Sequence, residues 1–377
     1  MTISNAHKLF KPVRVGELTL GHRIVLAPLT RYRANHAHVH GDLAVQYYAQ
    51  RASTSGTLLI TEATFIAEKA GGEGNVPGVW SDEQVAGWKR VTDAVHAKGS
   101  YIYLQLWALG RAASPDVLTK EGNHPYVSAS DFQLEGKPCP PRPLTVPEIQ
   151  EYVGLYAKAA SNAVHGAGFD GVEVHGANGY LIDQFTQDVS NKRTDEYGGS
   201  VENRCRFALD IVKAVVNAVG QEKVGIRLSP WGHFNGMRMN DPKPAFAYLV
   251  SQLVKRFPSM AYLHVVEPRV HGNADREVEE GESNDFLRNI WITDANTSRA
   301  YISAGGFTRD SAIATAESEW PGSDRELVAF GRKFISNPDL PRRLVEDLPL
   351  AEGNRDTYYT KESPTGYIDY PFADGNL

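Results

Sequence analysis

The sequence predicts an α/β protein with the (β/α)8 TIM-barrel fold, an N-terminal hairpin and long loops after several strands. Eight short runs of aliphatic and β-branched residues alternate with longer stretches of helical periodicity, the pattern of repeated strand–helix units. Several runs are apolar at successive positions, as expected for parallel strands buried on both faces. A chain of 377 residues is within the range of one such barrel, so we expect a single domain over residues 1–377.

The elements are expected in a simple order. Residues 10–20, with a polar turn at Gly16-Glu17, predict a small hairpin that closes the floor of the barrel. The eight strands are predicted at residues 24–29, 58–63, 101–107, 171–175, 224–229, 262–266, 300–304 and 327–330. The clearest helices are predicted at residues 82–98, 146–164, 201–219, 244–257 and 308–319, several of them opened by Ser or Thr and closed by Gly.

Long irregular segments follow three of the predicted strands, at residues 112–143, 232–243 and 267–284. The C-terminal ends of barrel strands form the face on which enzymes of this architecture build their active sites. We therefore expect these three segments to shape the access of a small-molecule substrate.

Composition argues against several classes of function. Apolar residues make up 42% of the chain, but no run approaches the roughly 20 residues of a membrane-spanning helix. The net charge of −6, with both signs interspersed, argues against nucleic-acid binding. Cys139 and Cys205 form neither a disulfide framework nor a metal-binding spacing, so we expect no metal and assign any redox chemistry to an organic cofactor. Without a secretory signal or a peroxisomal tripeptide, a cytoplasmic protein is expected, as a monomer or a homodimer.

The segment from Gly171 to Tyr180 is the most informative part of the chain. An apolar strand ends there in three polar side chains, His175, Asn178 and Tyr180. The first two can donate hydrogen bonds to one carbonyl oxygen, and the tyrosine offers a phenolic proton. A carbonyl held by two donors withdraws electrons from a conjugated double bond, so that hydride adds at one end and a proton at the other. The segment therefore indicates an enzyme that reduces activated alkenes.

Glycine and arginine follow the last two predicted strands, where barrels of this kind often bind phosphate. These residues are Gly305 and Gly306 after strand seven, and Gly331 and Arg332 after strand eight. Glycine exposes main-chain N–H groups and a guanidinium engages two phosphate oxygens. No Gly-x-Gly-x-x-Gly motif follows an early strand, so a mononucleotide such as FMN is favoured over a dinucleotide such as FAD.

These motifs and several others resemble the Old Yellow Enzyme family of FMN-dependent ene-reductases. The resemblance runs nearly from end to end, and the general look of the chain is similar to the filamentous-fungal branch that includes chanoclavine-aldehyde reductases. The segments that carry it are Ala27-Pro-Leu-Thr-Arg31, Thr61-Glu-Ala63, Gln105-Leu-Trp107, His175-Gly-Ala-Asn-Gly-Tyr-Leu-Ile-Asp-Gln-Phe185, Asn191-Lys-Arg-Thr-Asp-Glu-Tyr-Gly-Gly-Ser200, Glu202-Asn-Arg204 and Gly366-Tyr-Ile-Asp-Tyr-Pro371.

The resemblance implies a role for each residue of the site. The flavin ring would be lined by Pro28, Thr30, Ala63 and Gln105, with Arg227 at the N1–C2 edge, and its phosphate would be held by Gly305, Gly306, Gly331 and Arg332. His175 and Asn178 would hold the substrate carbonyl, and Tyr180 would protonate the α carbon after flavin N5 delivers hydride to the β carbon. NADPH would be the reductant, and the further substrate contacts would be Trp107, Tyr358 and Tyr359.

Other interpretations of the same residues remain open at this point. A flavin-free barrel acting as a sugar-phosphate aldolase or isomerase would need a strand-end lysine or carboxylate base, and only Glu173 and Glu267 offer themselves. A flavin-binding protein without turnover and a flavin-assisted isomerase are further alternatives. The block at residues 191–206 is expected to support the loop of Tyr180, with its arginines paired to Asp183, Asp195 or Glu202.

Overall fold

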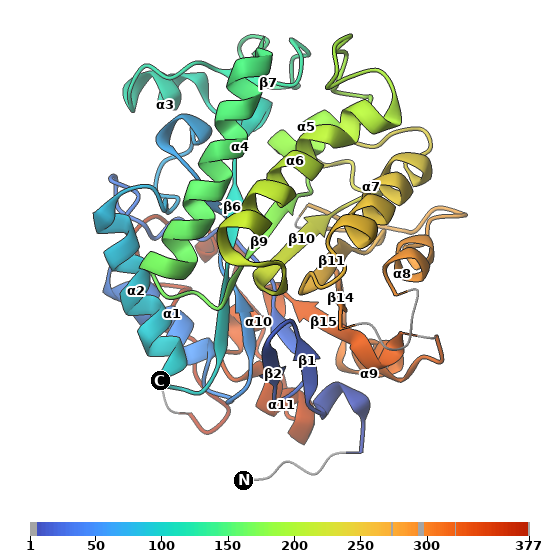
Figure 1. The fold of residues 1–377 in the computed structure, drawn as a ribbon. Coiled ribbons are helices and arrows are strands. Elements are labelled where there is room, and N and C mark those ends of the chain that lie inside the picture. The colour runs from blue at the N-terminus through green and yellow to red at the C-terminus, as the bar shows by residue number, and fades with distance from the viewer. Residues whose placement is uncertain (1–5, 273, 293–297, 321, 376–377) are drawn as a thin grey trace.

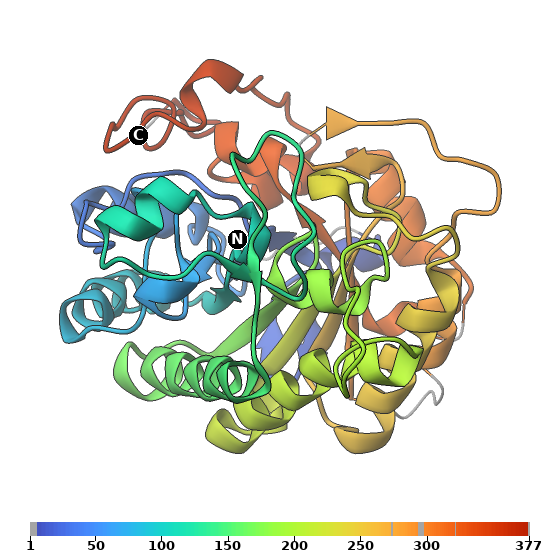
Figure 2. The ribbon, with the colours of Figure 1, turned by 90° about the horizontal axis from the view of Figure 1, so that it is seen from above.

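The computed structural model describes residues 6–272, 274–292, 298–320 and 322–375. Its centre is a closed barrel of parallel strands, in which β4 pairs with both β3 and β6 and so closes the ring. Figure 2 shows the helices arranged around these strands. The barrel strands, in order around the ring, are β3 (Ile24–Leu26), β4 (Leu58–Ile60), β6 (Tyr101–Trp107), β9 (Gly171–Gly176), β10 (Val224–Leu228), β11 (Tyr262–Val266), β14 (Ala300–Ala304) and β15 (Glu326–Phe330). The predicted fold class is confirmed.

The first two strands end three residues earlier than predicted, and the cause is visible in their hydrogen bonds. Pro28 has no N–H to continue the ladder after β3. After β4, the main-chain N–H of Glu62 donates to the hydroxyl of Tyr48 at 3.0 Å instead of to a neighbouring strand. The segments after β3 and β4 therefore both leave the sheet at the mouth of the barrel.

The helices cover the outside of the ring (Figure 1). All five predicted helices are present, and Ser81, Thr145, Ser200 and Thr308 cap four of them by accepting from a main-chain N–H. The outer helices are α1 (Asp42–Arg51), α2 (Asp82–His96), α4 (Val146–Ser161), α6 (Val201–Val219), α7 (Lys243–Arg256), α8 (Asp285–Trp291), α9 (Arg309–Glu317) and α11 (Leu340–Glu346). Among the described residues, none of the helices combines the length and the apolar character needed to cross a membrane.

The predicted hairpin closes the floor of the barrel. Strands β1 (Val13–Val15) and β2 (Leu18–Leu20) pair in antiparallel register. Their buried side chains pack with inward-facing strand residues in one apolar cluster, which includes Tyr103 and Tyr262. A Cβ on Gly225 would lie 2.3 Å from the ring of Tyr262, so glycine makes room for that ring inside the barrel. The lower half of the barrel is therefore a packed core and not a channel.

The loops beyond the strand ends contain more structure than their sequence indicated. Residues 112–143 include α3 (Pro115–Lys120) and the paired strands β7 (Val127–Ser128) and β8 (Arg142–Pro143). Residues 267–284 contain a short hairpin of β12 (Val270–His271) and β13 (Ala274–Asp275). Further short elements lie near the strand ends, namely β5 (Thr64–Phe65), α5 (Leu181–Thr186) and α10 (Arg332–Ser336).

Candidate active site

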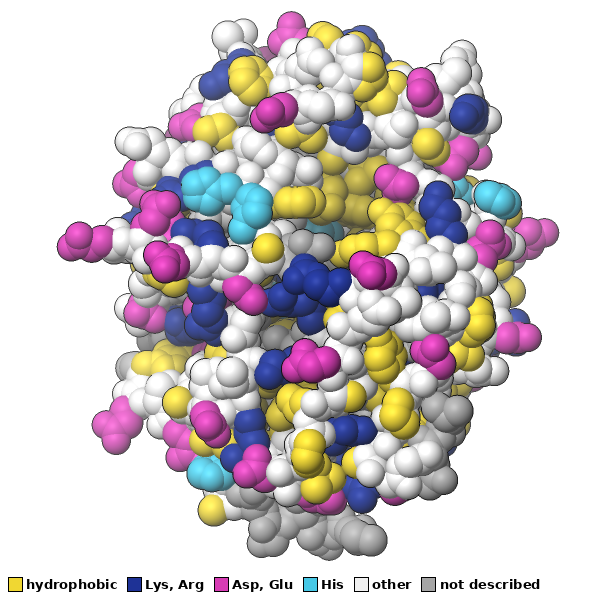
Figure 3. All heavy atoms as spheres, turned by 180° about the vertical axis from the view of Figure 1, so that it is seen from behind, with side chains coloured by type: hydrophobic (Ala, Val, Ile, Leu, Met, Phe, Trp, Pro, Cys, Tyr) yellow, Lys and Arg dark blue, Asp and Glu magenta, His cyan; other side chains and the backbone are white. Residues whose placement is uncertain are grey.

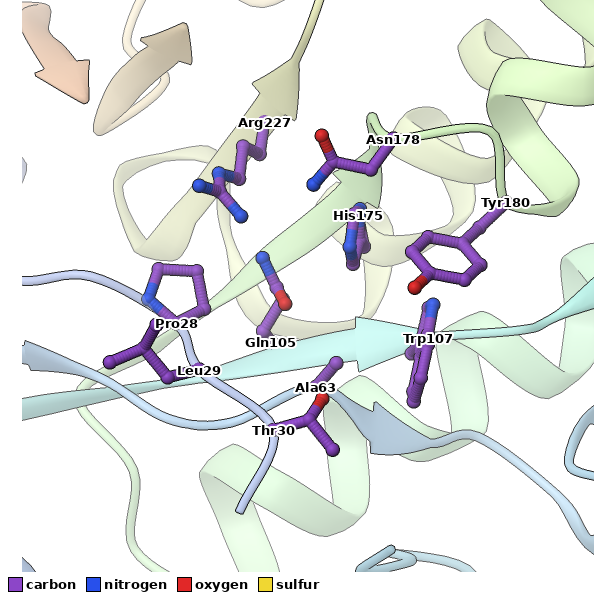
Figure 4. A pocket seen from close by; sticks show the side chains of 10 residues that line it. All are labelled: Pro28, Leu29, Thr30, Ala63, Gln105, Trp107, His175, Asn178, Tyr180 and Arg227. Carbon is purple, nitrogen blue, oxygen red and sulfur yellow. The ribbon is translucent and has the colours of Figure 1, made fainter. Parts of the chain in front are cut away.

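A cavity with about 330 Å³ of empty volume opens at the C-terminal ends of the barrel strands. It brings together nine of the residues predicted for the ring and substrate sites, from β6, β9, β10 and the segments after β3, β4 and β9 (Figure 4). Leu29 also lines it and was not predicted. The lining residues are Pro28, Leu29, Thr30, Ala63, Gln105, Trp107, His175, Asn178, Tyr180 and Arg227.

His175 is a neutral hydrogen-bond donor in this cavity. The main-chain N–H of Ala177 donates to its Nδ1 at 3.3 Å, so the ring proton lies on Nε2. Burial, followed by the positive charge of Arg227, lowers the pKa of His175 well below its ordinary value of 6.5. The ring can therefore donate to a carbonyl oxygen without carrying a charge.

Asn178 is held in a backbone conformation that leaves its side chain available. Its φ is +58°, a left-handed value that Asn tolerates better than most residues. Its main-chain N–H donates to Ser229 Oγ at 2.7 Å, and its carbonyl accepts from Asn235 Nδ2 at 3.0 Å. Figure 4 shows its carboxamide beside His175. Two neutral donors thus lie together at the end of β9.

Tyr180 lies against both of its aromatic neighbours. Its ring meets Trp107 edge to face at 4.7 Å between centroids and His175 at 5.1 Å. Burial raises the pKa of Tyr180, and a hydrogen bond with Asn235 acts in the opposite direction. The phenol therefore keeps its proton at neutral pH and is placed to donate it.

Arg227 is a partly buried cation that faces the cavity. Its Nε makes no hydrogen bond within the described residues, and burial lowers the pKa of the guanidinium although the nearby Glu173 opposes that shift. A buried positive charge is costly unless an anion or a strong acceptor meets it. Together with the amide of Gln105, the hydroxyl of Thr30 and the apolar surfaces of Pro28 and Ala63, it fits a flat ring that is polar at one edge and gains negative charge on reduction.

The predicted phosphate residues lie outside this cavity but close to one another. The carboxylate of Asp275 on β13 bonds to Arg332 and lies 3.5 Å from the Cβ position of Gly306. The carboxylate of Asp275 shows that the space between Gly306 and Arg332 can hold an anionic group. Gly305 and Gly306 have φ values of +130° and +59°, which favour glycine. Gly331 packs on Leu29, whose side chain lines the cavity, so the loop after β15 adjoins the ring site.

The two C-terminal tyrosines occupy different positions. Tyr358 is buried, its ring stacks near the guanidinium of Arg31 at 5.8 Å, and it does not line the cavity. Tyr359 is 46% exposed and contacts Tyr32 at 5.8 Å between ring centroids. The proposed substrate contacts of both tyrosines remain predictions.

Three further residues at the site were not predicted from the sequence. Asn235, at a φ of +57°, ties the loop after β10 to Asn178 and Tyr180. Arg269 donates to the carbonyl of Gly305 at 2.7 Å, and Asp275 bonds to Arg332. Asn235 and Arg269 stand a few residues beyond a strand end, a position that offers a weak signal in sequence. The position of Asp275 depends on the β12–β13 hairpin, which the sequence did not indicate.

The block at residues 191–206 supports the site, in part as expected. Arg193 pairs with Asp195 at 2.5 Å and donates to the carbonyl of Leu144. Asp183, which was a possible partner for these arginines, instead accepts from the main-chain N–H of Gly179 at 2.8 Å. The carboxylate thus fixes the turn between Asn178 and Tyr180 directly.

Nothing in the lining of the cavity fits the flavin-free aldolase alternative. No lysine is among the described residues that line it. Glu173 lies fully buried below it, and Glu267 is paired with Arg288 at 3.1 Å. Neither a Schiff-base lysine nor a free carboxylate base faces a ligand.

Comparison with known proteins agrees with this geometry. Residues 8–351 match the model of the NADH:flavin oxidoreductase / NADH oxidase family. The chain belongs to this family. It is 51% identical to the chanoclavine-I aldehyde reductase of Penicillium roqueforti (strain FM164) over 366 residues, which cover 97% of this chain and 96% of that protein.

Two solved structures of Old Yellow Enzyme type are similar over nearly their full length. The Old Yellow Enzyme from Pichia sp. AKU4542 is 38% identical with a TM-score of 0.88, covering 97% of this chain and 94% of its own. Morphinone reductase in complex with tetrahydroNAD is 40% identical with a TM-score of 0.86, covering 97% and 98%. The protein is therefore an Old Yellow Enzyme-like FMN oxidoreductase with a TIM-barrel fold.

Proposed function

We propose that this flavoprotein uses NADPH to reduce the activated C=C bond of α,β-unsaturated aldehydes and ketones, with residues 1–377 acting as one FMN-binding domain. The observation that carries the proposal is the convergence of His175, Asn178 and Tyr180 in one cavity, with Arg227 and Gln105 on the two strands that flank β9. The similar protein from Penicillium roqueforti, whose name states chanoclavine-I aldehyde as its substrate, supports the choice of aldehydes.

When bound, FMN would supply the hydride chemistry that links NADPH to the β carbon of the alkene. The ring is held by Pro28, Thr30, Ala63, Gln105 and Arg227, and its phosphate by Gly305, Gly306, Gly331 and Arg332. The positive charge of Arg227 stabilises the negative charge that the ring system gains on reduction.

The chain's own residues perform the rest of the reaction. Nε2–H of His175 and the amide of Asn178 donate to the substrate carbonyl, so charge that develops on its oxygen is stabilised as hydride adds. Tyr180 keeps its proton until the α carbon becomes basic and then donates it there. Trp107, edge to face with Tyr180 at 4.7 Å, limits the phenol ring to one orientation.

Product analysis tests this function. Incubation with NADPH and cyclohexenone should give cyclohexanone and one NADP⁺ for each alkene consumed. In D₂O, the product should carry solvent deuterium at the α carbon and none at the β carbon. Recovery of an allylic alcohol, or consumption of NADPH without a reduced alkene, would contradict the proposal. A positional isomer of the substrate with no net NADPH consumed would favour the isomerase alternative.

A further inference from the structure

A carboxylate lies directly beneath the cavity, and the reaction described above does not use it. Glu173 on β9 is fully buried. One of its oxygens accepts from Gln105 Nε2 at 2.7 Å, and the other accepts from His264 Nδ1 at 2.8 Å. Glu173 therefore holds Gln105, one of the residues predicted to line the flavin ring, from below the cavity.

The position of this carboxylate follows from strand register. Side chains two apart on a strand face the same side, so Glu173 points into the barrel like His175 above it. Gln105 is its neighbour on β6, and Arg227 on β10 is level with both His175 and His264. One polar layer thus lies between the cavity and the apolar lower core, which includes Tyr103 and Tyr262. Its members are Glu173, Gln105, Arg227 and His264.

The layer has a definite charge. Burial raises the pKa of Glu173, but His264, Arg227 and Gln105 together outweigh it and hold the pKa below the ordinary value, so the carboxylate is ionised. Burial lowers the pKa of His264, which is therefore neutral, with its proton on Nδ1 where it bonds to Glu173. The negative charge of Glu173 and the positive charge of Arg227 cancel within the layer.

Stability alone does not account for this arrangement. Buried ion pairs are often no more stabilising than apolar residues of similar volume, and the layer immediately below is filled with apolar and aromatic side chains. Among the described strand residues that face the inside of the barrel, the charged ones lie where the barrel meets the cavity. The two upward-facing members of the layer, Gln105 and Arg227, are the two that face a ligand.

We propose that Glu173 is a positioning residue that sets both the affinity for FMN and the reduction potential of the flavin. By accepting from Nε2 of Gln105, it fixes which way that amide is turned and leaves Oε1 free to accept from the ring, where an acceptor suits the single N–H of the oxidised flavin. Its negative charge offsets part of the charge of Arg227, so the pocket stabilises the reduced ring less than a lone arginine would. The inference rests on the proposed binding of FMN in this cavity.

The test is the reduction potential of the holoenzyme, measured by anaerobic titration against a reference dye. Glu173→Gln keeps the shape and removes the charge, so the potential should become more positive. We expect the preference for reduced over oxidised FMN to rise at least tenfold, which for a two-electron couple corresponds to about 30 mV. Flavin reduction by NADPH should continue, and reoxidation by cyclohexenone should slow. A wild-type potential in this variant would overturn the proposal.

Two further variants keep the test decisive. Glu326→Gln makes the same substitution at another fully buried strand carboxyl, whose pKa burial raises to about 7 and which lies beside Arg288 away from the cavity, and it should leave the potential unchanged above pH 7 as well as below it. Glu173→Asp keeps the charge but shortens the reach to Gln105, so FMN affinity should fall while the potential stays within about 30 mV of wild type. If Glu173→Gln does not fold, unchanged FMN affinity in Glu173→Asp would overturn the proposal. Wild-type protein without FMN would instead contradict the proposed function.

Discussion

The floor and the mouth of the cavity are built in opposite ways. The floor consists of strand residues, some of which are hydrogen-bonded below the cavity, as in the bond from Gln105 to Glu173. The mouth consists of loops and the C-terminal segment, and all four large apolar side chains that are exposed in the described structure lie there: Phe132, Phe234, Val278 and Tyr359. A rigid polar floor suits chemistry that is the same for every substrate, and an apolar mouth suits recognition of the rest of the molecule.

On the face that Figure 3 shows, Lys and Arg side chains are interspersed with Asp and Glu. No broad region of one charge is visible on that face. The exposed apolar side chains around the mouth, and not a charged patch on this face, are therefore the feature that suits a small, largely apolar substrate.

Removal of the proposed proton donor should give the largest effect and should separate the two half-reactions. We expect Tyr180→Phe to slow alkene reduction by ~10²–10⁴-fold, the usual contribution of a general acid. Flavin reduction by NADPH should stay near wild type, because that step needs no proton from Tyr180. Stopped-flow absorbance of each half-reaction measures both. Tyr359→Phe, which removes a hydroxyl at the mouth, is the matched control, and equal losses in both half-reactions of Tyr180→Phe would contradict the assignment.

Loss of one carbonyl donor on the floor should cost somewhat less. His175→Leu is expected to lower kcat/KM for cyclohexenone by ~10²–10³-fold, as for other donors to a developing oxyanion. His271→Leu makes the same change on the β12 strand of the mouth and should have a far smaller effect. Comparable losses in the two variants would remove the distinction between floor and mouth.

The pH dependence of alkene reduction tests the state of His175. A histidine with a lowered pKa loses its proton at a pH below the ordinary value, so across pH 6–8 the ring should stay neutral and keep its Nε2–H. The pH profile of kcat/KM should therefore show no inflection near pH 6.5 that is due to His175. An inflection due to this residue would be present in the wild type and absent from His175→Leu. Such an inflection would show that the charged imidazolium takes part.

Buried arginines hold the C-terminal segment of the mouth, and Arg33 makes the most hydrogen bonds to it, although Arg31 also donates to the carbonyls of Tyr358 and Gly366. Arg33 donates to the carbonyls of Tyr358, Thr357, Ser363 and Thr365. Arg33→Met leaves the carbonyls of Thr357, Ser363 and Thr365 without their charged partner, at a cost of about 1–3 kcal/mol for the group, while Arg31 still donates to the carbonyl of Tyr358. We expect faster proteolysis within residues 355–370 and a higher KM, with an unchanged flavin spectrum. Protection equal to wild type in limited proteolysis would contradict this role.

Single changes at the apolar rim should have the smallest effects. Tyr359→Ala and Phe234→Ala are expected to change kcat/KM by less than about tenfold, which corresponds to about 1.4 kcal/mol, because both side chains are exposed and contribute at the lower end of the range of about 1–3 kcal/mol for a hydrophobic contact. The change should be larger for enones with bulky apolar substituents than for cyclohexenone. Steady-state kinetics over a series of substituted enones measures the difference. An equal loss for all enones would contradict a role of these residues in recognising the substituents.

The floor was predictable from sequence and much of the mouth was not. The barrel strands are short, apolar runs whose ends are marked by residues such as His175 and Arg227, so the side chains at their C-terminal ends could be assigned to one site from sequence alone. The pairing of Glu173 with His264 and the β12–β13 hairpin depend on contacts between distant segments, which no local pattern encodes. Helix α1 was not predicted because its periodicity is weak, and helices α8, α10 and α11 were not predicted because they are short.

The most direct test of the account is the visible absorbance spectrum of the purified protein, recorded anaerobically before NADPH, after NADPH and after cyclohexenone. The account predicts an oxidised-flavin spectrum that bleaches with NADPH and returns when the enone is added. A colourless protein that also fails to take up added FMN would contradict it.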